Sequence, residues 1–171
     1  LLVATVVVLS FLTLYYLGNK IVAKADSLNF SKPVAIGLMI SIGIGLHNFG
    51  EGLAIGAAVG IGSIAFSTFL IVGFALHNTT EGIAIAAPMS RGKLMLGKLA
   101  IMGMIAGTPA IFGAWIGGFA YSPFTSVIFL AIGAGAIFQV ILVLMKWIQK
   151  ENDGNLSNLS IVSGFAIGML V

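Results

Sequence analysis

The stretch HNFGEGLAIGAAVGIGSIAFSTFLIVGFALHNTTEG, residues 47–82, decides how this chain folds. It begins and ends with the same polar pattern, His-Asn-x-x-Glu-Gly, and almost everything between the two copies is apolar or glycine. Near its middle, the residues Gly60-Ile61-Gly62-Ser63 have the chemistry of a turn. The stretch therefore predicts two adjacent helices that run in opposite directions, each carrying one copy of the pattern.

The composition of the whole chain places these helices in a membrane. Of its 171 residues, 59% are hydrophobic and 8% are charged, whereas soluble domains contain roughly 25% charged residues. The net charge of +3 does not indicate nucleic-acid binding, and the lack of cysteine excludes disulfides and thiolate metal ligands. We expect a single membrane domain, residues 1–171, that has the lipid bilayer as a partner.

Six apolar runs have the length, or nearly the length, of a transmembrane helix, which needs about 20 residues. We interpret the first run as a helix and not as a signal peptide, because the basic residues follow it instead of preceding it. The first and last runs are short, and we expect either to be truncated. The sequence thus predicts an all-α polytopic transmembrane bundle with spans at 1–17, 33–58, 64–88, 94–118, 124–147 and 157–171.

The positions of the basic residues support this number of spans. All 8 lie in or beside the odd-numbered connections, at residues 19–32, 90–98 and 146–155. Odd-numbered connections share one side of the membrane, and the positive-inside rule makes that side cytoplasmic. We therefore expect both chain ends outside, and we assign the protein to the plasma membrane of a prokaryote.

The repeated pattern predicts a shared site near mid-membrane, on the helix pair 33–88. His47 and Glu51 are four residues apart and share a helix face, as do His77 and Glu81. A buried carboxylate in lipid costs at least about 2.5 kcal/mol, and no Lys or Arg lies deep enough in a span to pair with either glutamate. Protons or a bound cation must neutralise them, and two carboxylates with two imidazoles suit a divalent transition metal.

Several polar and small residues also have purely structural interpretations. A single His or Asn in a span usually forms a hydrogen bond between helices, although a duplicated pattern is hard to explain by packing alone. The glycines after each glutamate, Gly52 and Gly82, allow either close helix packing or a locally loosened helix. Three further residues are candidates for either a structural hydrogen bond or a place along a transport pathway, namely Gln139, Thr108 and Ser41.

The segments HNFGEGLAIG and HNTTEGIAIAAP, with the short SRGK connection after the second, resemble the ZIP (Zrt-/Irt-like protein) family of divalent metal transporters. The resemblance implies eight helices, of which this chain covers the third to the eighth, so that the first two are expected to be missing. It implies transport of Zn²⁺ or Fe²⁺, with Mn²⁺ and Cd²⁺ as further candidates. It leaves open whether the protein forms a homodimer. The transport site it implies consists of His47, Asn48, Glu51, His77, Asn78 and Glu81.

The chain departs from the family pattern at several points. Gly50 and Thr80 stand where many bacterial members have proline. Some members hold two metals with help from an acidic residue in the next span, but span 94–118 has no carboxylate, and Thr108-Pro109 occupies the corresponding place. We therefore expect one principal metal.

The function expected from these patterns is metal transport by alternating access and not enzymatic catalysis. Two other classes remain as alternatives. An intramembrane zinc-dependent hydrolase would use the same ligands, although catalytic zinc usually has three protein ligands and one open position. A proton- or sodium-coupled carrier would use the carboxylates without a metal.

Overall fold

The computed structural model describes residues 1–25, 27, 29–90, 96–151 and 163, and this part of the chain is helical apart from its turns. Each of its five long helices is long and apolar enough to cross a membrane. The expected sixth span, 157–171, lies outside the described residues except for position 163. The helices are α1 (Leu2–Ala23), α2 (Lys32–Gly60), α3 (Ile64–Ala86), α4 (Leu96–Phe119) and α5 (Pro123–Glu151), and the short 3₁₀ turn η2 (Ala87–Met89) follows α3.

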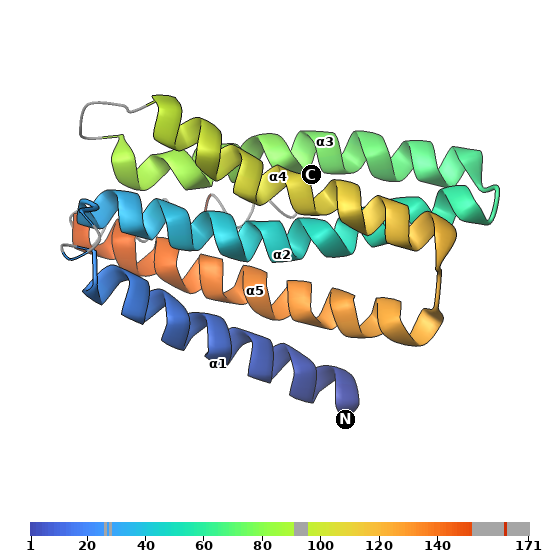
Figure 1. Cartoon of the computed structure of the whole chain (residues 1–171), viewed down its shortest axis with the longest axis horizontal. Coiled ribbons are helices and arrows are strands. Elements are labelled where there is room, and N and C mark those ends of the chain that lie inside the picture. Colours follow the sequence, from blue (N-terminus) through green and yellow to red (C-terminus); the bar gives the residue numbers. More distant parts are fainter. Residues whose placement is uncertain (26, 28, 91–95, 152–162, 164–171) are drawn as a thin grey trace.

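Proline and glycine mark several of the helix boundaries. Pro33 lies in the first turn of α2 and Pro123 is the first residue of α5, positions where the missing N–H has no partner to lose. The turn between α2 and α3 contains Gly62 with a φ of 75°, a conformation that glycine adopts without steric cost. This turn reverses the chain within three residues, so α3 returns directly beside α2 (Figure 1).

The first helix is longer than the sequence predicted. We expected the span to end at residue 17, but α1 continues to Ala23 and includes Lys20. The Lys20 ammonium lies 4.4 Å from the centre of the Tyr16 ring, where a cation is stabilised by the aromatic face. Its long side chain can also reach the membrane surface while its backbone stays helical, so a lysine was a poor marker of the helix end.

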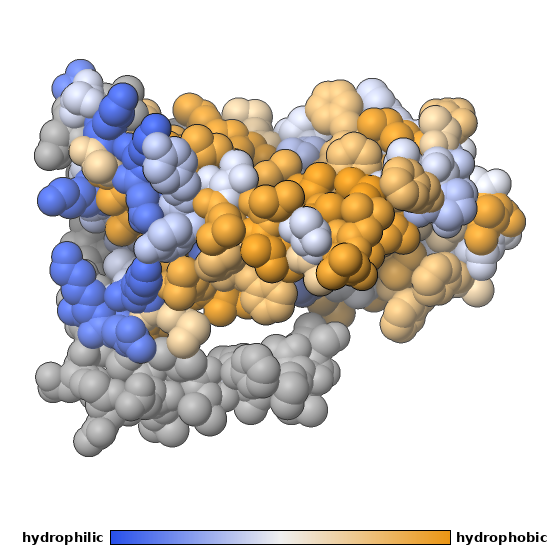
Figure 2. Space-filling model, turned by 90° about the horizontal axis from the view of Figure 1, so that it is seen from below, coloured by the Kyte–Doolittle hydropathy of each residue, from blue (hydrophilic) through white to orange (hydrophobic). Residues whose placement is uncertain are grey.

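Successive helices alternate in direction, so five helix ends meet at one end of the bundle (Figure 1). We call this the basic end, because the described lysines lie on these helix ends and in the first connection. Figure 2 shows hydrophilic side chains gathered there, next to a broad apolar surface. The described lysines are Lys20, Lys24, Lys32, Lys98, Lys146 and Lys150.

Helix α2 lies at the centre of the bundle and is its most buried helix (Figure 1). It packs against α4 backbone to backbone: a Cβ atom placed on Gly52 or Gly56 would collide with the carbonyl of Ala110 or Ala114, and one on Gly113 would collide with that of Phe49. Small residues permit such close approach between helices in a membrane. Helix α2 is therefore held firmly by α4, whereas α3 is largely exposed.

Candidate metal centre

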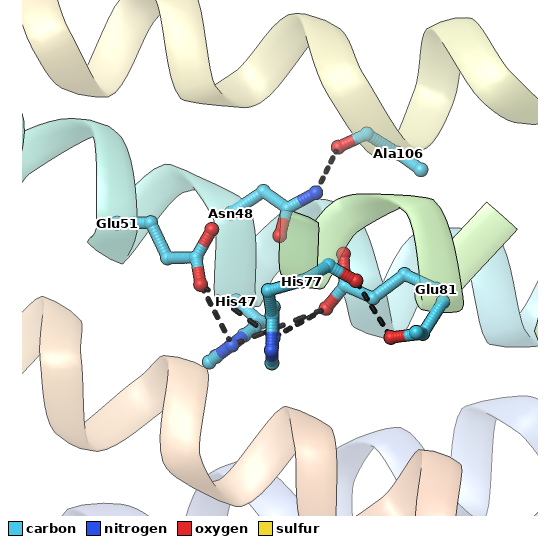
Figure 3. Close-up of polar contacts among 7 residues, drawn as sticks. His47, Asn48, Glu51, His77, Glu81 and Ala106 are labelled. Atoms are coloured by element: carbon cyan, nitrogen blue, oxygen red, sulfur yellow. Dashed lines mark hydrogen bonds and ion pairs between the residues drawn. The ribbon is translucent and has the colours of Figure 1, made fainter. Parts of the chain in front are cut away.

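Four side chains from two adjacent helices converge between α2 and α3 (Figure 3). The His47 Nε2 atom lies 3.4 Å from Glu51 Oε1 and 4.0 Å from Glu81 Oε1. The His77 Nε2 atom lies 3.7 Å from Glu51 Oε1 and 3.4 Å from Glu81 Oε1. Each glutamate therefore contacts a histidine on its own helix and one on the other, as expected for two i,i+4 pairs brought to the same depth.

The spacing of three of these residues, His47, Glu51 and His77, is compatible with ligands around one small cation. Tetrahedral zinc with ligands at about 2.0–2.1 Å requires neighbouring ligand atoms to be about 3.4 Å apart. The four nitrogen–oxygen distances range from 3.4 to 4.0 Å. Ligand atoms of His47, Glu51 and His77 all lie within 4.8 Å of one another. Glu81 is not part of this three-residue group, so a fourth ligand from Glu81 would require its side chain to shift toward the other three.

The two carboxylates are buried among apolar helices. Glu51 and Glu81 are each only 7% exposed, and Glu51 Oε2 and both oxygens of Glu81 have no hydrogen-bond partner. The ion pairs of these carboxylates in the described part of the chain are all with the two histidines. Buried carboxylate oxygens without donors are costly, and a divalent cation or protons would remove that cost.

Asn48 makes a hydrogen bond to a helix outside the motif pair. Its Nδ2 atom donates a hydrogen bond of 3.1 Å to the carbonyl of Ala106 on α4, as Figure 3 shows. Its Oδ1 atom is buried without a partner. The side chain thus ties the metal-motif helix to α4 and still has one oxygen available toward the site.

Asn78 is not joined to the four-residue cluster by a hydrogen bond or an ion pair among the described residues. It is half-buried, and its Oδ1 atom has no hydrogen-bond partner. The two asparagines occupy equivalent positions in the repeat, but only Asn48 faces a packed neighbouring helix. The repeat therefore does not produce two equivalent environments.

The two glycines that follow the glutamates also differ. A Cβ atom on Gly52 would fall on the backbone of α4, whereas one on Gly82 would meet nothing within 4 Å. Both glycines lie in uninterrupted helix. Close packing therefore accounts for Gly52, and neither glycine opens its helix.

A glycine on α5 that the sequence did not single out lies beside the site. A Cβ atom on Gly133 would be 3.2 Å from the Cα atom of His47, which is a tight approach of α5 to the metal-motif helix. The pair Gly133 and Gly135 was the available signal, since Gly135 in turn approaches Val7 of α1. Neighbouring glycines on one helix thus bring α5 close to both α2 and α1.

The three further candidates lie away from the four ligands or are already bonded. The Ser41 hydroxyl donates to the Gly37 carbonyl at 2.8 Å, an ordinary bond within a helix. Thr108 is exposed on α4. Gln139 is 1% exposed and neither of its amide atoms has a hydrogen-bond partner. A Cβ atom on Gly43 or Gly18 would lie near that amide, so Gln139 sits where α1, α2 and α5 meet.

Comparison with known proteins adds no relative. No protein family, curated protein or solved structure matched the chain. The interpretation of the site therefore rests on its own geometry and chemistry.

Proposed function

We propose that this protein transports divalent transition-metal cations, zinc or iron first, across a membrane. The observation that supports this most is the convergence of His47, Glu51, His77 and Glu81 at distances of 3.4 to 4.0 Å within a bundle of apolar helices. A structural role is harder to reconcile with carboxylate oxygens that are buried without donors. Intramembrane carboxylates commonly mark substrate or ion pathways.

Each residue has a distinct part in the proposed cycle. The imidazoles bind the metal through Nε2, and the two carboxylates bind it and cancel its two positive charges, so the occupied site is neutral in a medium of low dielectric constant. When the metal leaves, protons bind to the same groups and keep the empty site from carrying two bare charges. Alternating access then requires that the site opens to one membrane side at a time.

The donor set favours one principal metal. Four donors complete a tetrahedral shell, and α4, the helix packed nearest to α2, has no acidic residue between Leu96 and Phe119. Asn48 Oδ1 is the further oxygen donor closest to hand in the repeat, and its bond to Ala106 holds the side chain in position. A second ion at this site would have only neutral ligands and would bind more weakly.

The resemblance of both motifs to the ZIP family is the basis for proposing membership of that family. The clustering of lysines at the basic end supports an orientation with this end in the cytoplasm. Both expected chain ends would then face outward, and the plasma membrane of a prokaryote is the proposed location. These assignments describe a transporter and not an enzyme.

Two other functions use the same residues differently. A zinc hydrolase would need three protein ligands and one open position for water, and His47, Glu51 and His77 form a three-residue group. A metal-free carrier would need only protonation of Glu51 and Glu81. Zinc-dependent ester or peptide hydrolysis by the purified protein would favour the first, and transport without metal binding would favour the second.

Uptake of zinc into proteoliposomes containing the full chain tests the proposal. Glu51→Gln and Glu81→Gln keep the side-chain shape but remove one anionic ligand each, and both should reduce uptake at least tenfold. Thr79→Val is the matched control on α3, because the Thr79 hydroxyl is bonded to the Ala75 carbonyl of its own helix. Wild-type uptake by both glutamine variants would refute the proposal.

A further inference from the structure

A pocket at the basic end, distinct from the metal centre, is lined by lysine side chains. It has a volume of about 430 Å³ and lies among α1, α2, α5 and the residues after α3. Its polar lining consists of Asn19, Lys32, Lys146 and Lys150, with Trp147 beside them. We propose that this pocket binds the phosphate headgroup of an anionic phospholipid.

The charge of the pocket selects an anion. Three ammonium groups, from Lys32, Lys146 and Lys150, line it, and the described lining residues contain no Asp or Glu. Lys32 is also the first residue of α2, so the partial positive charge at the start of a 29-residue helix adds to that of the lysines. The N-cap residue Ser31 makes no side-chain capping bond.

One of these lysines contacts a side chain of α1. The Lys146 Nζ atom lies 3.4 Å from the Tyr15 hydroxyl oxygen and 4.9 Å from the centre of the same ring. This contact links α5 to α1 and limits the conformations that Lys146 can adopt. A positioned ammonium group loses less side-chain entropy when it binds a ligand.

The remaining lining indicates a lipid and not a soluble phosphate. Apolar residues complete the wall, among them Val22, Ile36 and Val143. In Figure 2 the hydrophilic end lies directly against the apolar surface of the bundle, as expected where headgroups meet acyl chains. Trp147 is an amphipathic residue of the type enriched at that depth. A phospholipid matches both parts, since its phosphate reaches the lysines and its chains lie along the apolar wall.

Basic pockets between transmembrane helices are a general mode of anionic headgroup recognition. The size of this pocket falls within the range of small-ligand sites, roughly 300–1,000 Å³. A lipid bound there would contact α1, α2 and α5 at once and would hold these three helices together. This inference does not depend on what the metal centre does.

Tryptophan fluorescence in vesicles can test the site directly. The chain has two tryptophans, so Trp115→Phe leaves Trp147 as the only reporter. The protein is reconstituted in phosphatidylcholine vesicles with increasing brominated phosphatidylglycerol, whose bromine quenches a neighbouring indole. A parallel series uses brominated phosphatidylcholine. We expect phosphatidylglycerol to be preferred at Trp147 by about tenfold or more, since each lysine near the surface favours an anionic lipid by roughly fivefold.

Three triple variants separate a specific pocket from general surface charge. The preference for phosphatidylglycerol should be lost in the triple variant Lys32→Gln, Lys146→Gln, Lys150→Gln. The three corresponding Arg substitutions should retain most of this preference. The matched control neutralises three lysines that do not line the pocket, namely Lys20, Lys24 and Lys98, and should also retain it. Equal quenching by the two lipids, or equal loss in the control, would overturn the proposal. Abolition of the preference by millimolar inorganic phosphate, but not by chloride of the same ionic strength, would overturn the lipid assignment in favour of a soluble phosphate.

Discussion

Adding one methyl group to Gly52 tests how the metal-motif helix is held. The Cβ atom of Gly52→Ala would collide with the Ala110 carbonyl and approach the Ala114 nitrogen at 2.9 Å. These are backbone atoms of α4, which cannot rotate away as a side chain can. The equivalent glycine of the second motif is the natural control, because a Cβ atom on Gly82 meets nothing within 4 Å.

The magnitude follows from the comparison of the two alanine variants. Alanine is favoured over glycine inside a helix by roughly 1 kcal/mol, and this gain applies to both. Overpacking costs about 1–3 kcal/mol and applies only to Gly52→Ala. The free energies of unfolding of the two variants should therefore differ by about 1–3 kcal/mol, with Gly52→Ala the less stable. The value should lie toward the upper end, because the rigidly placed Cβ atom collides with backbone atoms of α4.

The assay is unfolding of the purified protein in mixed micelles with increasing sodium dodecyl sulfate, followed by far-ultraviolet circular dichroism. Gly82→Ala should unfold at the same or a higher detergent fraction than the wild type, and Gly52→Ala at a clearly lower one. Separation of α2 from α4 should also break the bond between Asn48 and Ala106 and weaken zinc binding. If Gly52→Ala is as stable as Gly82→Ala, the close contact between α2 and α4 is wrong.

Three more expectations concern the site, the core and the topology. Because the ligands must be deprotonated to bind metal, zinc affinity should rise with pH and zinc binding should release protons, both measurable by titration calorimetry in two buffers; a pH-independent affinity would contradict this. Gln139→Met should raise the free energy of unfolding by about 1–3 kcal/mol, since it removes buried amide atoms that have no partner; a loss of stability would show that the amide is bonded. The chain has no cysteine, so a single introduced thiol can report the topology. The thiol of Ser31→Cys should react with an impermeant maleimide only from the cytoplasmic side, and that of Ser63→Cys only from the opposite side. Labelling of both variants from one side would exclude the proposed topology.

Sequence reasoning could predict the meeting of the two motifs because it depends on local regularities. The four-residue spacing puts His and Glu on one face of each helix, and a short turn midway between the copies sets their depth. Neither step needs knowledge of distant contacts. The helical class followed in the same way from the lengths of the apolar runs, and the described part of the chain has five helices long and apolar enough to cross a membrane.

Contacts between helices that are distant in sequence could not be predicted in this way. Glycines in both α2 and α4 indicated close packing, but nothing in the pattern named the partner helix. For this reason the sequence did not predict the bond between the Asn48 amide nitrogen and the Ala106 carbonyl of α4. The different environments of Gly52 and Gly82 have the same origin, since identical motifs were placed against unequal neighbours.

The end of α1 was missed because of a different physical effect. Polar residues after position 17 suggested the start of a connection, but a helix can continue beyond the apolar zone when its lysines reach toward water. The contact between Lys20 and Tyr16 stabilises that last part of α1. Hydropathy therefore located the span and not the end of the helix.

X-ray absorption at the zinc edge of the zinc-loaded full chain tests the central claim most directly. The account predicts one tightly bound zinc per chain, with four nitrogen or oxygen ligands at about 2.0–2.1 Å and the scattering signature of two imidazoles. His47→Ala with His77→Ala should abolish that signature, and Thr79→Val should preserve it. Failure of the wild-type protein to bind zinc, or an unchanged spectrum in the double histidine variant, would contradict the claim that these two helices form a metal site.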